Sequence, residues 1–319
     1  MSANSMGLNI CQIAAEVAPF AKTGGLGDVV LGLSRFLGQT GHDVRIFLPF
    51  YPSLREEHER TGRYIPVGFI QDVPIQLGST RLTYSLRTAK LPDSEVDAYF
   101  VDCPVLFGEG GIYRGDRLDS RRFGLLTLAA FECCQRMGWA PDIVHVHDWH
   151  TALAPLFLRT HFAWDRLFAR TQTVLTIHNA GYQGIVERDI VGDLGLDRYA
   201  HLLHREDLAN GHVNFLKSGL LHASVVTAVS KTYAKEIQRA EFGHGLEPWF
   251  RARGVLGIVN GVDYADWNPE TDRFLDHHYS AEDLSGKRQL KKALLEEVGL
   301  GDTEAPVIGI VSRLTSQKG

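Results

Sequence analysis

Short apolar runs alternate along this chain with stretches of helical periodicity, and this alternation constrains the fold more than any other feature. A buried-type run over 8–15 leads into a glycine-rich turn and a helical pattern over 27–40. Further strand-like runs lie at 44–48, 143–147, 173–178, 224–229 and 255–259. Strands that alternate with helices are typical of a parallel sheet covered on both faces. We therefore predict an α/β fold with a Rossmann-like, doubly wound parallel sheet.

The segment 64–102 has a different pattern. Four short strand-like runs with turns between them, at 64–70, 73–77, 81–88 and 97–101, predict a small β-rich insertion that returns to the main sheet. Beyond it, helical patterns predict helices over 121–138, 151–159, 213–223 and 230–240. Ser230 is the expected N-cap of the last of these helices.

The last fifty residues predict a change of domain. Residues 272–300 are polar and helical, including 287–298, and 306–311 is an apolar, β-branched run that predicts a buried strand. A strand followed by a basic, glycine-ended loop is how a second parallel α/β domain begins. We expect an N-terminal Rossmann-like domain over 1–263, a linker and helical segment over 264–304, and the first strand and loop of a second domain over 305–319. About 150 further residues would complete that domain.

Composition excludes several classes of protein. Of the 319 residues 44% are apolar and 22% are charged, as in ordinary globular proteins, and the net charge of −5 argues against a broad nucleic-acid-binding surface. No run approaches the roughly 18 apolar residues of a membrane span, and the N-terminus lacks the basic region of a signal peptide. The four cysteines form no C-x-x-C pair, which favours reduced thiols and a cytoplasmic protein.

The loop Lys22-Thr23-Gly24-Gly25-Leu26-Gly27-Asp28 lies between the first predicted strand and the first helix. Glycines allow the backbone to approach a ligand, a helix N-terminus offers free N–H groups to an anion, and Lys22 adds a positive charge. The spacing matches neither the dinucleotide-binding nor the Walker fingerprint. Spacing alone leaves two interpretations open, a phosphate site or a tight glycine turn beside a solvated lysine.

Two further motifs follow strands, where ligands bind in open α/β sheets. In Val144-His145-Val146-His147-Asp148-Trp149-His150, strand alternation puts His145 and His147 on one face, and Asp148 is suited to accept hydrogen bonds from a sugar hydroxyl. A zinc site and simple packing of His145 are the alternatives. In the second motif, 176–184, His178 and Asn179 offer donors and acceptors for a polyol, although a structural histidine is the alternative.

Two loops add candidates nearer the C-terminus. Asn260-Gly261-Val262-Asp263 is most simply a turn, because Asn-Gly favours positive φ, and it contributes to a site only if it faces the same cleft. In Ser312–Gly319, Arg313 and Lys318 could clamp a diphosphate, the first with its forked guanidinium and the second as a point charge; a solvated basic tail is the alternative.

Together these motifs resemble the family of bacterial glycogen synthases and plant starch synthases. The matching blocks are 22–29, 144–151, 176–184, 215–219, 227–230, 260–263 and 311–319, in the order of the family. The resemblance implies a GT-B fold, two Rossmann-like domains with a cleft between them. It implies transfer of glucose from ADP-glucose to the non-reducing end of an α-1,4-glucan such as glycogen, with retention of configuration and with neither a metal nor a cofactor.

The resemblance also implies roles for individual residues. Lys22, with the backbone of Gly24 and Gly25, would lie against the donor phosphates and sugar, in a block that ends at Asp28. Asp148, His178 and Asn179 would hold the transferred glucose, and Asn260 would line the same pocket. Arg313 and Lys318 would neutralise the diphosphate as ADP leaves. Tyr113, in Gly111-Ile112-Tyr113, is similar to a tyrosine of the family near the donor sugar.

The chain departs from the family pattern after Gly319, because a later glutamate-containing block and most of the nucleotide-sugar domain lie beyond it. We therefore expect this polypeptide alone to have little or no synthase activity. One alternative is a non-catalytic glucan-binding or regulatory fragment. Another is a metal hydrolase that uses His145, His147 and His178, but it accounts for neither the Lys22 loop nor the basic terminal loop.

Overall fold

The computed structural model describes residues 7–264 and 267–312. The chain divides into two compact units, 1–261 and 262–319, and each is described by itself. The strands of the first unit are β1 (Asn9–Ile13), β2 (Asp43–Pro49), β3 (Ile65–Pro66), β4 (Val73–Leu77), β5 (Thr80–Lys90), β6 (Asp97–Asp102), β7 (Ile143–His147), β8 (Gln172–Ile177), β9 (Ile185–Glu187), β10 (His212–Asn214), β11 (Val225–Ala228) and β12 (Leu256–Gly257).

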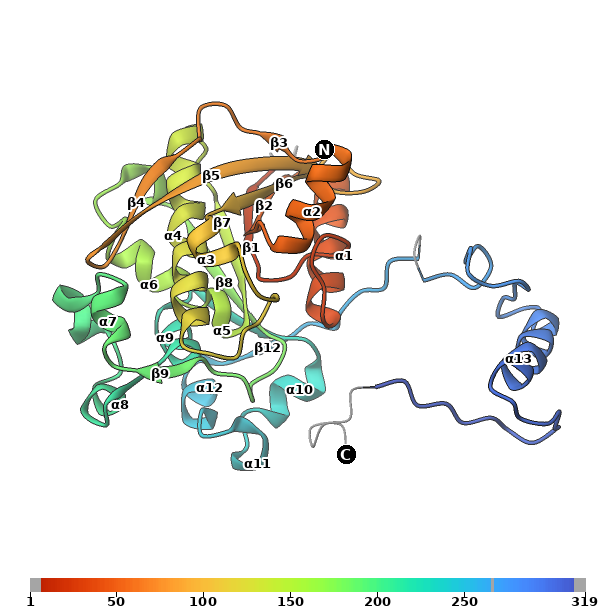
Figure 1. Cartoon of the computed structure of the whole chain (residues 1–319). Helices are drawn as coiled ribbons and strands as arrows, with labels where there is room; N and C mark the ends of the chain where they lie inside the picture. Colours follow the sequence, from red (N-terminus) through yellow and green to blue (C-terminus); the bar gives the residue numbers. More distant parts are fainter. Residues whose placement is uncertain (1–6, 265–266, 313–319) are drawn as a thin grey trace, which may run out of the picture. The chain divides into compact units, whose positions relative to one another are not determined.

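Helices occupy most of the connections between these strands (Figure 1). They are α1 (Gly25–Gln39), α2 (Pro52–Thr61), α3 (Pro104–Phe107), α4 (Leu118–Met137), α5 (Asp148–Thr151), α6 (Ala154–Arg159), α7 (Ile190–Asp193), α8 (Arg205–Ala209), α9 (Phe215–His222), α10 (Lys231–Glu236), α11 (Ala240–Gly243), α12 (Glu247–Arg253) and α13 (Ser285–Glu297). Two 3₁₀ helices lie at Arg166–Phe168 and Asp197–Leu202.

The main sheet confirms the predicted parallel, doubly wound architecture. Its strand order is β12-β11-β8-β7-β1-β2-β6-β5-β3, and the strands from β12 to β6 run parallel. From β1 the chain proceeds to β2 on one side, whereas from β7 it proceeds to β8 on the other. The crevice between β1 and β7 is therefore the point where the winding reverses, which is where open α/β sheets bind their ligands.

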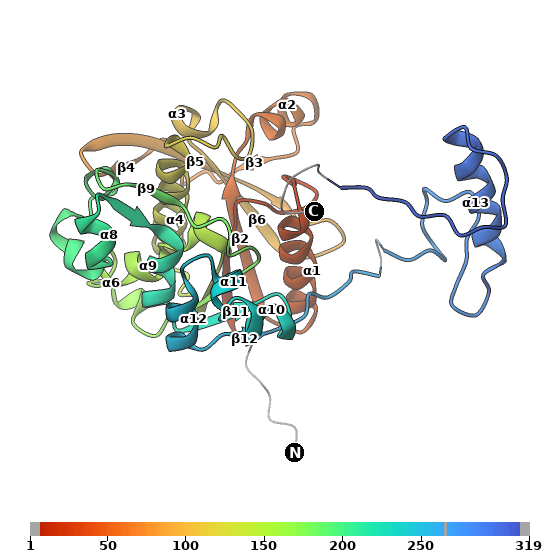
Figure 2. The ribbon, with the colours of Figure 1, turned by 90° about the horizontal axis from the view of Figure 1, so that it is seen from below.

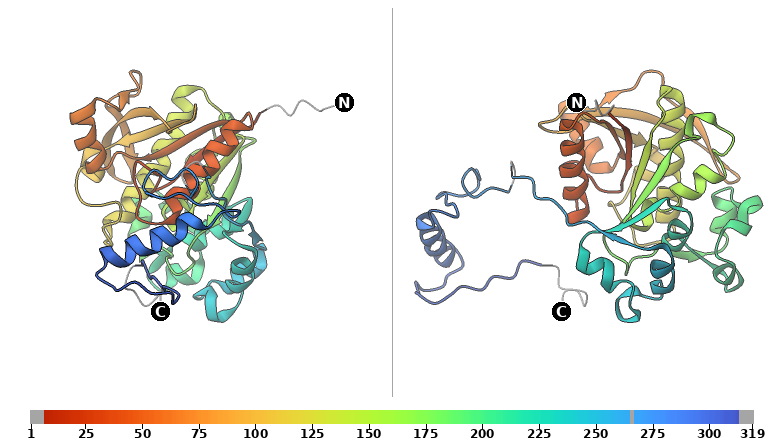
Figure 3. Two further views of the ribbon diagram at one scale, coloured as in Figure 1. Left: turned by 90° about the vertical axis from the view of Figure 1, so that its right-hand side faces the viewer. Right: turned by 180° about the vertical axis from the view of Figure 1, so that it is seen from behind.

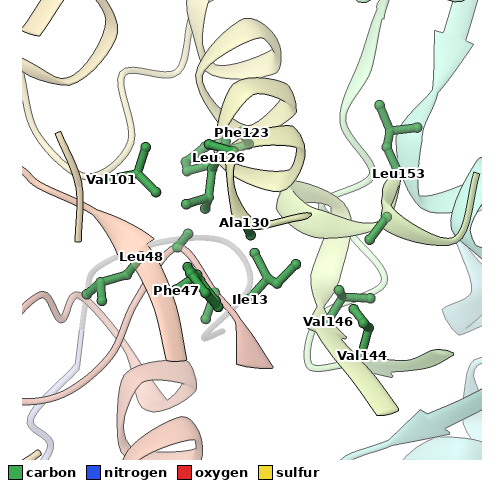
Figure 4. Close-up of a cluster of buried hydrophobic side chains, with 14 of the residues drawn as sticks. Ile13, Phe47, Leu48, Val101, Phe123, Leu126, Ala130, Val144, Val146 and Leu153 are labelled. Carbon is green, nitrogen blue, oxygen red and sulfur yellow. The ribbon is translucent and has the colours of Figure 1, made fainter. Parts of the chain in front are cut away.

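Helices α1 and α4 lie on opposite faces of the sheet, as right-handed crossovers in opposite directions require (Figures 1 and 3). Figure 4 shows Phe123, Leu126 and Ala130 of α4 above Ile13 of β1 and Phe47 of β2. All five side chains are fully buried. The spacing of three and four residues along α4 puts its apolar side chains on the face that meets the sheet. This layer of packing fixes the positions of β1 and β7, and thus of the loops that follow them.

The predicted β-rich insertion is confirmed, and its strands β6, β5 and β3 extend the main sheet. Strand β6 pairs in parallel with β2, and β5 pairs antiparallel with both β6 and β4. Gly78, in the β4–β5 turn, has φ of +58°, a conformation that favours glycine.

Several predicted element boundaries were wrong. The helix expected over 151–159 is two short helices, α5 and α6, because Pro155 is tolerated only in the first turn of a helix and α6 begins there. The first residues of the helix expected over 213–223 instead form β10, which pairs with β9. The N-cap prediction is confirmed, since Ser230 Oγ accepts a hydrogen bond from Tyr233 N at 2.9 Å. Helices α10, α11 and α12 follow in succession beside β11 and β12 (Figure 2).

The second unit contains α13, which is shorter than the helical segment expected over 272–300. The expected buried strand over 306–311 is wrong, because these residues form no strand and the side chains of Ile308, Ile310 and Val311 are exposed. A strand needs a neighbour to pair its backbone groups, whatever its side chains favour. The division into domains at 263 and 304 stays a prediction. No described helix is long and apolar enough to cross a membrane.

Candidate active site

Three loops meet where the carboxyl ends of β1, β7 and β8 lie side by side. The loop 14–24 follows β1, His147 ends β7 and Asp148 begins α5, and the turn 178–184 follows β8. The sheet therefore gathers the three N-terminal motifs that the sequence singled out.

The Lys22 loop is fastened from inside by Glu16, a residue that the sequence reading missed. Glu16 is buried, and its Oε2 accepts hydrogen bonds from Thr23 N at 2.5 Å and Gly24 N at 3.0 Å. Its Oε1 accepts a hydrogen bond from Thr23 Oγ1 at 2.9 Å. The carboxylate thus pairs two backbone N–H groups immediately before α1 begins. Its position three residues after β1 is the only signal that the sequence offered.

The glycines of this loop have different roles. A Cβ at Gly27 would lie 3.3 Å from Ala18 N and 3.4 Å from Ala21 O, so close packing favours glycine here. A Cβ at Gly24 or Gly25 would meet nothing within 4 Å. The open space above Gly24 and Gly25 is what a site needs if a ligand is to approach the backbone at the start of a helix.

Lys22 stands at the surface of this loop. Its Nζ lies 2.8 Å from Asp28 Oδ1 in the first turn of α1, and both side chains are partly exposed. The ion pair holds the ammonium group beside the helix N-terminus. Because the pair is open to solvent, an incoming anion can compete with Asp28 for Lys22 at small energetic cost.

Tyr113 reaches the same loop from the segment between α3 and α4. Its hydroxyl donates a hydrogen bond to Glu16 Oε1, and its ring stacks on His150 with centroids 4.7 Å apart. Burial and the neighbouring Glu16 raise the pKa of Tyr113 far above its usual value, so the phenol remains a neutral donor. The structure therefore places Tyr113 beside the Lys22 loop.

Asp148 fastens the turn after β8. It is buried, has φ of +50°, and its Oδ1 accepts hydrogen bonds from His178 N at 2.7 Å and Asn179 N at 3.2 Å. Burial raises the pKa of Asp148 to about 7, although these two hydrogen bonds act in the opposite direction. One carboxylate oxygen is thus used to fix the backbone of the turn, a role that strand-end position alone did not predict.

The rest of the turn is held by its own side chains and by α10. Asn179 Oδ1 accepts a hydrogen bond from Gly181 N at 3.0 Å, and the hydroxyl of Tyr233 accepts one from Ala180 N at 2.9 Å. Gly184 has φ of +61°, and a Cβ there would lie 2.3 Å from the Trp149 ring. Trp149 accordingly packs inward against Gly184 and is only partly exposed.

Four histidines gather under these loops as neutral rings. Burial lowers the pKa of His145 and His150 to about 3 and that of His178 to about 4, and it lowers the pKa of His147 as well. His147 Nδ1 lies 3.1 Å from His178 Nε2, and His147 Nε2 lies 2.9 Å from Gln12 Oε1. A neutral imidazole has one donor and one acceptor, so Gln12 sets the direction of this relay.

The hydrogen bonds of these rings argue against the metal-hydrolase alternative. Both nitrogens of His147 are engaged, and His145 Nε2 pairs with Thr176 Oγ1 at 2.7 Å. Within 7–264 and 267–312, no group of three or more His, Cys, Asp and Glu side chains is arranged to hold a metal ion.

The other predicted site residues lie elsewhere. Asn260 is exposed and follows β12, within the first unit. Arg313 and Lys318 lie outside the residues that the structure describes. Their predicted roles therefore stay predictions.

Comparison with known proteins identifies the family. The model of the starch synthase catalytic domain family matches residues 9–252, which include the three loops of the site. The chain belongs to this family.

Two glycogen synthases that are similar in sequence agree with this assignment. The glycogen synthase of Koribacter versatilis (strain Ellin345) is 42% identical over 318 residues, covering 98% of this chain and 64% of the relative. The glycogen synthase of Streptococcus pneumoniae (strain ATCC 700669 / Spain 23F-1) is 40% identical over 321 residues, with the same coverage. The chain thus spans about two thirds of the length of these relatives.

A solved family member confirms the fold. The catalytic domain of Starch Synthase IV from Arabidopsis thaliana, bound to ADP and acarbose, superposes with a TM-score of 0.83 at 34% identity. The match covers 94% of this chain and 61% of that one. The described first unit therefore corresponds to part of a family catalytic domain of GT-B type.

Proposed function

We propose that the complete protein transfers glucose from ADP-glucose to the non-reducing end of an α-1,4-glucan, with retention of configuration. Two sequence relatives are named glycogen synthase, and the solved starch synthase relative holds ADP and acarbose. Neither a metal nor a cofactor is part of the proposal, and neither nucleic acid nor a membrane is among the partners. Four free, buried cysteines favour the cytoplasm.

The observation that supports this proposal most is the meeting of Lys22, Tyr113, Asp148 and His178 at the β1–β7 crevice. These residues are far apart in the chain, yet they share partners. Glu16 binds both the Lys22 loop and Tyr113, and Asp148 binds the His178 turn. A packing role alone would not require a cation, a neutral phenol and neutral imidazoles at one edge of the sheet.

On this proposal the Lys22 loop binds the diphosphate of ADP-glucose. As the glycosyl–phosphate bond breaks, negative charge grows on the departing diphosphate, and a fixed cation stabilises that charge. Lys22 would exchange Asp28 for a phosphate oxygen, and Gly24 and Gly25 would let the phosphates approach the start of α1. Arg313 and Lys318 would act on the same charge from the second domain.

The Asp148 side would hold the transferred glucose. Among the described residues, Asp148 Oδ2 has no hydrogen-bond partner, so it is left to accept from a sugar hydroxyl. His178 is half-buried and neutral, and Asn179 lies beside it. Neutral partners suit a sugar that becomes oxocarbenium-like, because a cation near that carbon would oppose the developing positive charge. Asn260 would complete the pocket.

Replacing Lys22 tests the proposal. In a synthase completed with its second domain, we expect Lys22→Gln to lower kcat by at least about a hundredfold, the cost of losing one preorganised electrostatic partner. Lys90→Gln is the matched control, since Lys90 is similarly exposed and paired with Asp97 at 3.0 Å, but lies on β5. Unchanged kcat and KM in Lys22→Gln would refute the role of Lys22.

For the 319-residue chain itself, we propose little or no turnover, because the cleft needs two domains. Incubation with ADP-glucose and glycogen, with glucan elongation followed over time, tests this expectation. Rapid elongation would overturn it. Glycogen binding without turnover, found also in a completed protein, would instead favour a non-catalytic glucan-binding or regulatory role.

A further inference from the structure

A fourth loop contacts the His178 turn at the carboxyl edge of the sheet. It is the segment 243–245, where α11 ends, and His244 stands at its centre. A Cβ at Gly181, within the His178 turn, would lie 3.6 Å from His244 Nε2. His244 is exposed, so its imidazole lies beside the turn and is open to solvent.

Two buried amides fix the position of this loop. Gln183 Nε2 donates hydrogen bonds to His244 O at 2.9 Å and to Ala180 O at 3.3 Å. Gln183 Oε1 accepts a hydrogen bond from Asn214 Nδ2 at 2.6 Å. Because Asn214 Oδ1 accepts from Lys217 N at 2.9 Å, the orientation of both amides is determined. Gln183 and Asn214 are buried, so they hold His244 at a fixed place against the turn.

The backbone of His244 adopts a conformation that favours glycine. Its φ is +49° and its ψ is +37°, in the left-handed region, where a Cβ crowds the following carbonyl oxygen. In the described part of the chain, its imidazole forms no hydrogen bond and no ion pair, so the side chain does not offset this strain within the fold. Residues held in such conformations cluster at functional sites. The ring is therefore free to contact a ligand.

The order of the strands indicates which part of the substrate lies near His244. The Lys22 loop follows β1, Asp148 follows β7 and the His178 turn follows β8, while α10 and α11 follow β11 beyond β8. Neighbouring strands are about 4.8 Å apart, so β1 and β8 are separated by about 10 Å. With the diphosphate beside Lys22, the anomeric carbon of the transferred glucose faces the Lys22 loop. C4 lies across a pyranose ring from C1, so the hydroxyls at C4 and C6 face the far side of the turn, where His244 lies.

We propose that His244 contacts the transferred glucose at the hydroxyls on the side of C4 and C6. An imidazole nitrogen can donate a hydrogen bond to a hydroxyl or accept one from it. The inference rests on the proposed function, which puts the diphosphate beside Lys22. It goes further by making His244 a determinant of donor specificity, because a sugar without the contacted hydroxyl loses this hydrogen bond.

Replacing His244 by glycine tests the proposal in a synthase completed with its second domain. His244→Gly removes the imidazole and relieves the left-handed backbone, so it should unfold at the same or a higher urea concentration. We expect kcat/KM for ADP-glucose to fall about two- to tenfold, the effect of one lost neutral hydrogen bond. A purely structural role of His244 would not lower activity while stability is kept.

Asp93→Gly is the matched control. Asp93 is also a non-glycine residue with positive φ, +52°, but it lies between β5 and β6 at the amino edge of the sheet. Its replacement relieves a similar backbone conformation away from the site, so kcat/KM should stay unchanged.

Donors that lack a single hydroxyl identify the contact. With 4-deoxyglucose and 6-deoxyglucose carried on ADP, the wild type and His244→Gly should have equal kcat/KM for the donor that lacks the contacted hydroxyl. A difference that persists with both deoxy donors, unchanged kcat/KM of His244→Gly with ADP-glucose, or a loss of stability in that variant would each overturn the proposal. A completed wild-type synthase that is inactive with ADP-glucose would refute the proposed function, and this inference with it.

Discussion

The Lys22 loop and the His178 turn are each fastened by one buried carboxylate. Glu16 accepts hydrogen bonds from the backbone of Thr23 and Gly24, and Asp148 accepts them from the backbone of His178 and Asn179. In both places one side chain accepts hydrogen bonds from two backbone N–H groups of a partly buried turn. A buried carboxylate that accepts two backbone hydrogen bonds therefore stabilises each half of the candidate site.

The two halves of the candidate site differ in charge. In the half formed by the Lys22 loop, Lys22 and Asp28 form a partly exposed ion pair. In the half formed by the His178 turn, the imidazoles of His145 and His178 are neutral at physiological pH because they are buried. Lys22 and Asp28 therefore keep their charges where solvent or a ligand can reach them, whereas the buried imidazoles beside Asp148 are neutral and rely on hydrogen bonds.

The largest expected effect is on the His178 turn. Asp148→Ala removes the acceptor for two partly buried N–H groups and should lower the free energy of unfolding by about 2–4 kcal/mol, since each unpaired group costs about 1–3 kcal/mol when buried. Asp148→Asn keeps an oxygen at this position and should cost much less. Urea unfolding of both variants measures the difference, and equal stability of the two would contradict the anchoring role.

The buried histidines and Asp148 also determine how the stability of the fold should depend on pH. The lowered pKa values of His145, His150 and His178 give stability that is present above about pH 6.5 and is lost as pH falls toward 4. Asp148, with a pKa raised to about 7, acts oppositely: its contribution is present below about pH 4 and is lost as pH rises through 7. Three histidines outweigh one aspartate, so stability should rise from pH 4 to 6.5.

Asp148→Asn sharpens this prediction, because it removes the opposing group. The slope of stability against pH between 4 and 6.5 should become steeper, by up to about 1.4 kcal/mol per pH unit. Urea unfolding at a series of pH values measures both slopes. An unchanged slope in the variant would show that the Asp148 carboxyl is ionised throughout this range.

A smaller loss of stability is expected when Glu16 is replaced. Glu16→Gln leaves one acceptor oxygen for Thr23 N, Gly24 N and the Tyr113 hydroxyl, and should cost about 1–3 kcal/mol. Tyr113→Phe removes only one donor and should cost about 0.5–1.5 kcal/mol. Thermal unfolding of the two variants shows which loses more stability. A larger loss of stability in Tyr113→Phe than in Glu16→Gln would show that Glu16 is not the residue that anchors this loop.

The smallest effect on stability is expected at Lys22. A partly exposed ion pair contributes about 0–1 kcal/mol, so Lys22→Gln should unfold at nearly the same denaturant concentration as Lys90→Gln. A large loss of stability in Lys22→Gln alone would mean that Lys22 serves the fold, and would remove the contrast between the two halves.

Sequence reasoning placed the candidate motifs at strand ends, and such motifs meet wherever parallel strands are neighbours. It missed the residues that hold the loops. The hydrogen bond between Tyr113 and Glu16 spans 97 residues, that between His147 and Gln12 spans 135, and that between Ala180 and Tyr233 spans 53. No local pattern specifies such pairs. The strand expected over 306–311 failed for a related reason, because a β-branched run specifies a preference and pairing requires a neighbour.

The order of strands and helices, and hence which loops share the carboxyl edge of the sheet, was determined by the sequence by itself. Periodicity and the handedness of crossovers act along the chain, so they can be read from it. Only the tertiary structure decided which polar atoms pair and which groups remain charged. Hydrogen bonding and desolvation depend on neighbours brought from distant segments, and a residue such as Glu16 or Asp148 acquires its role only when those segments pack together.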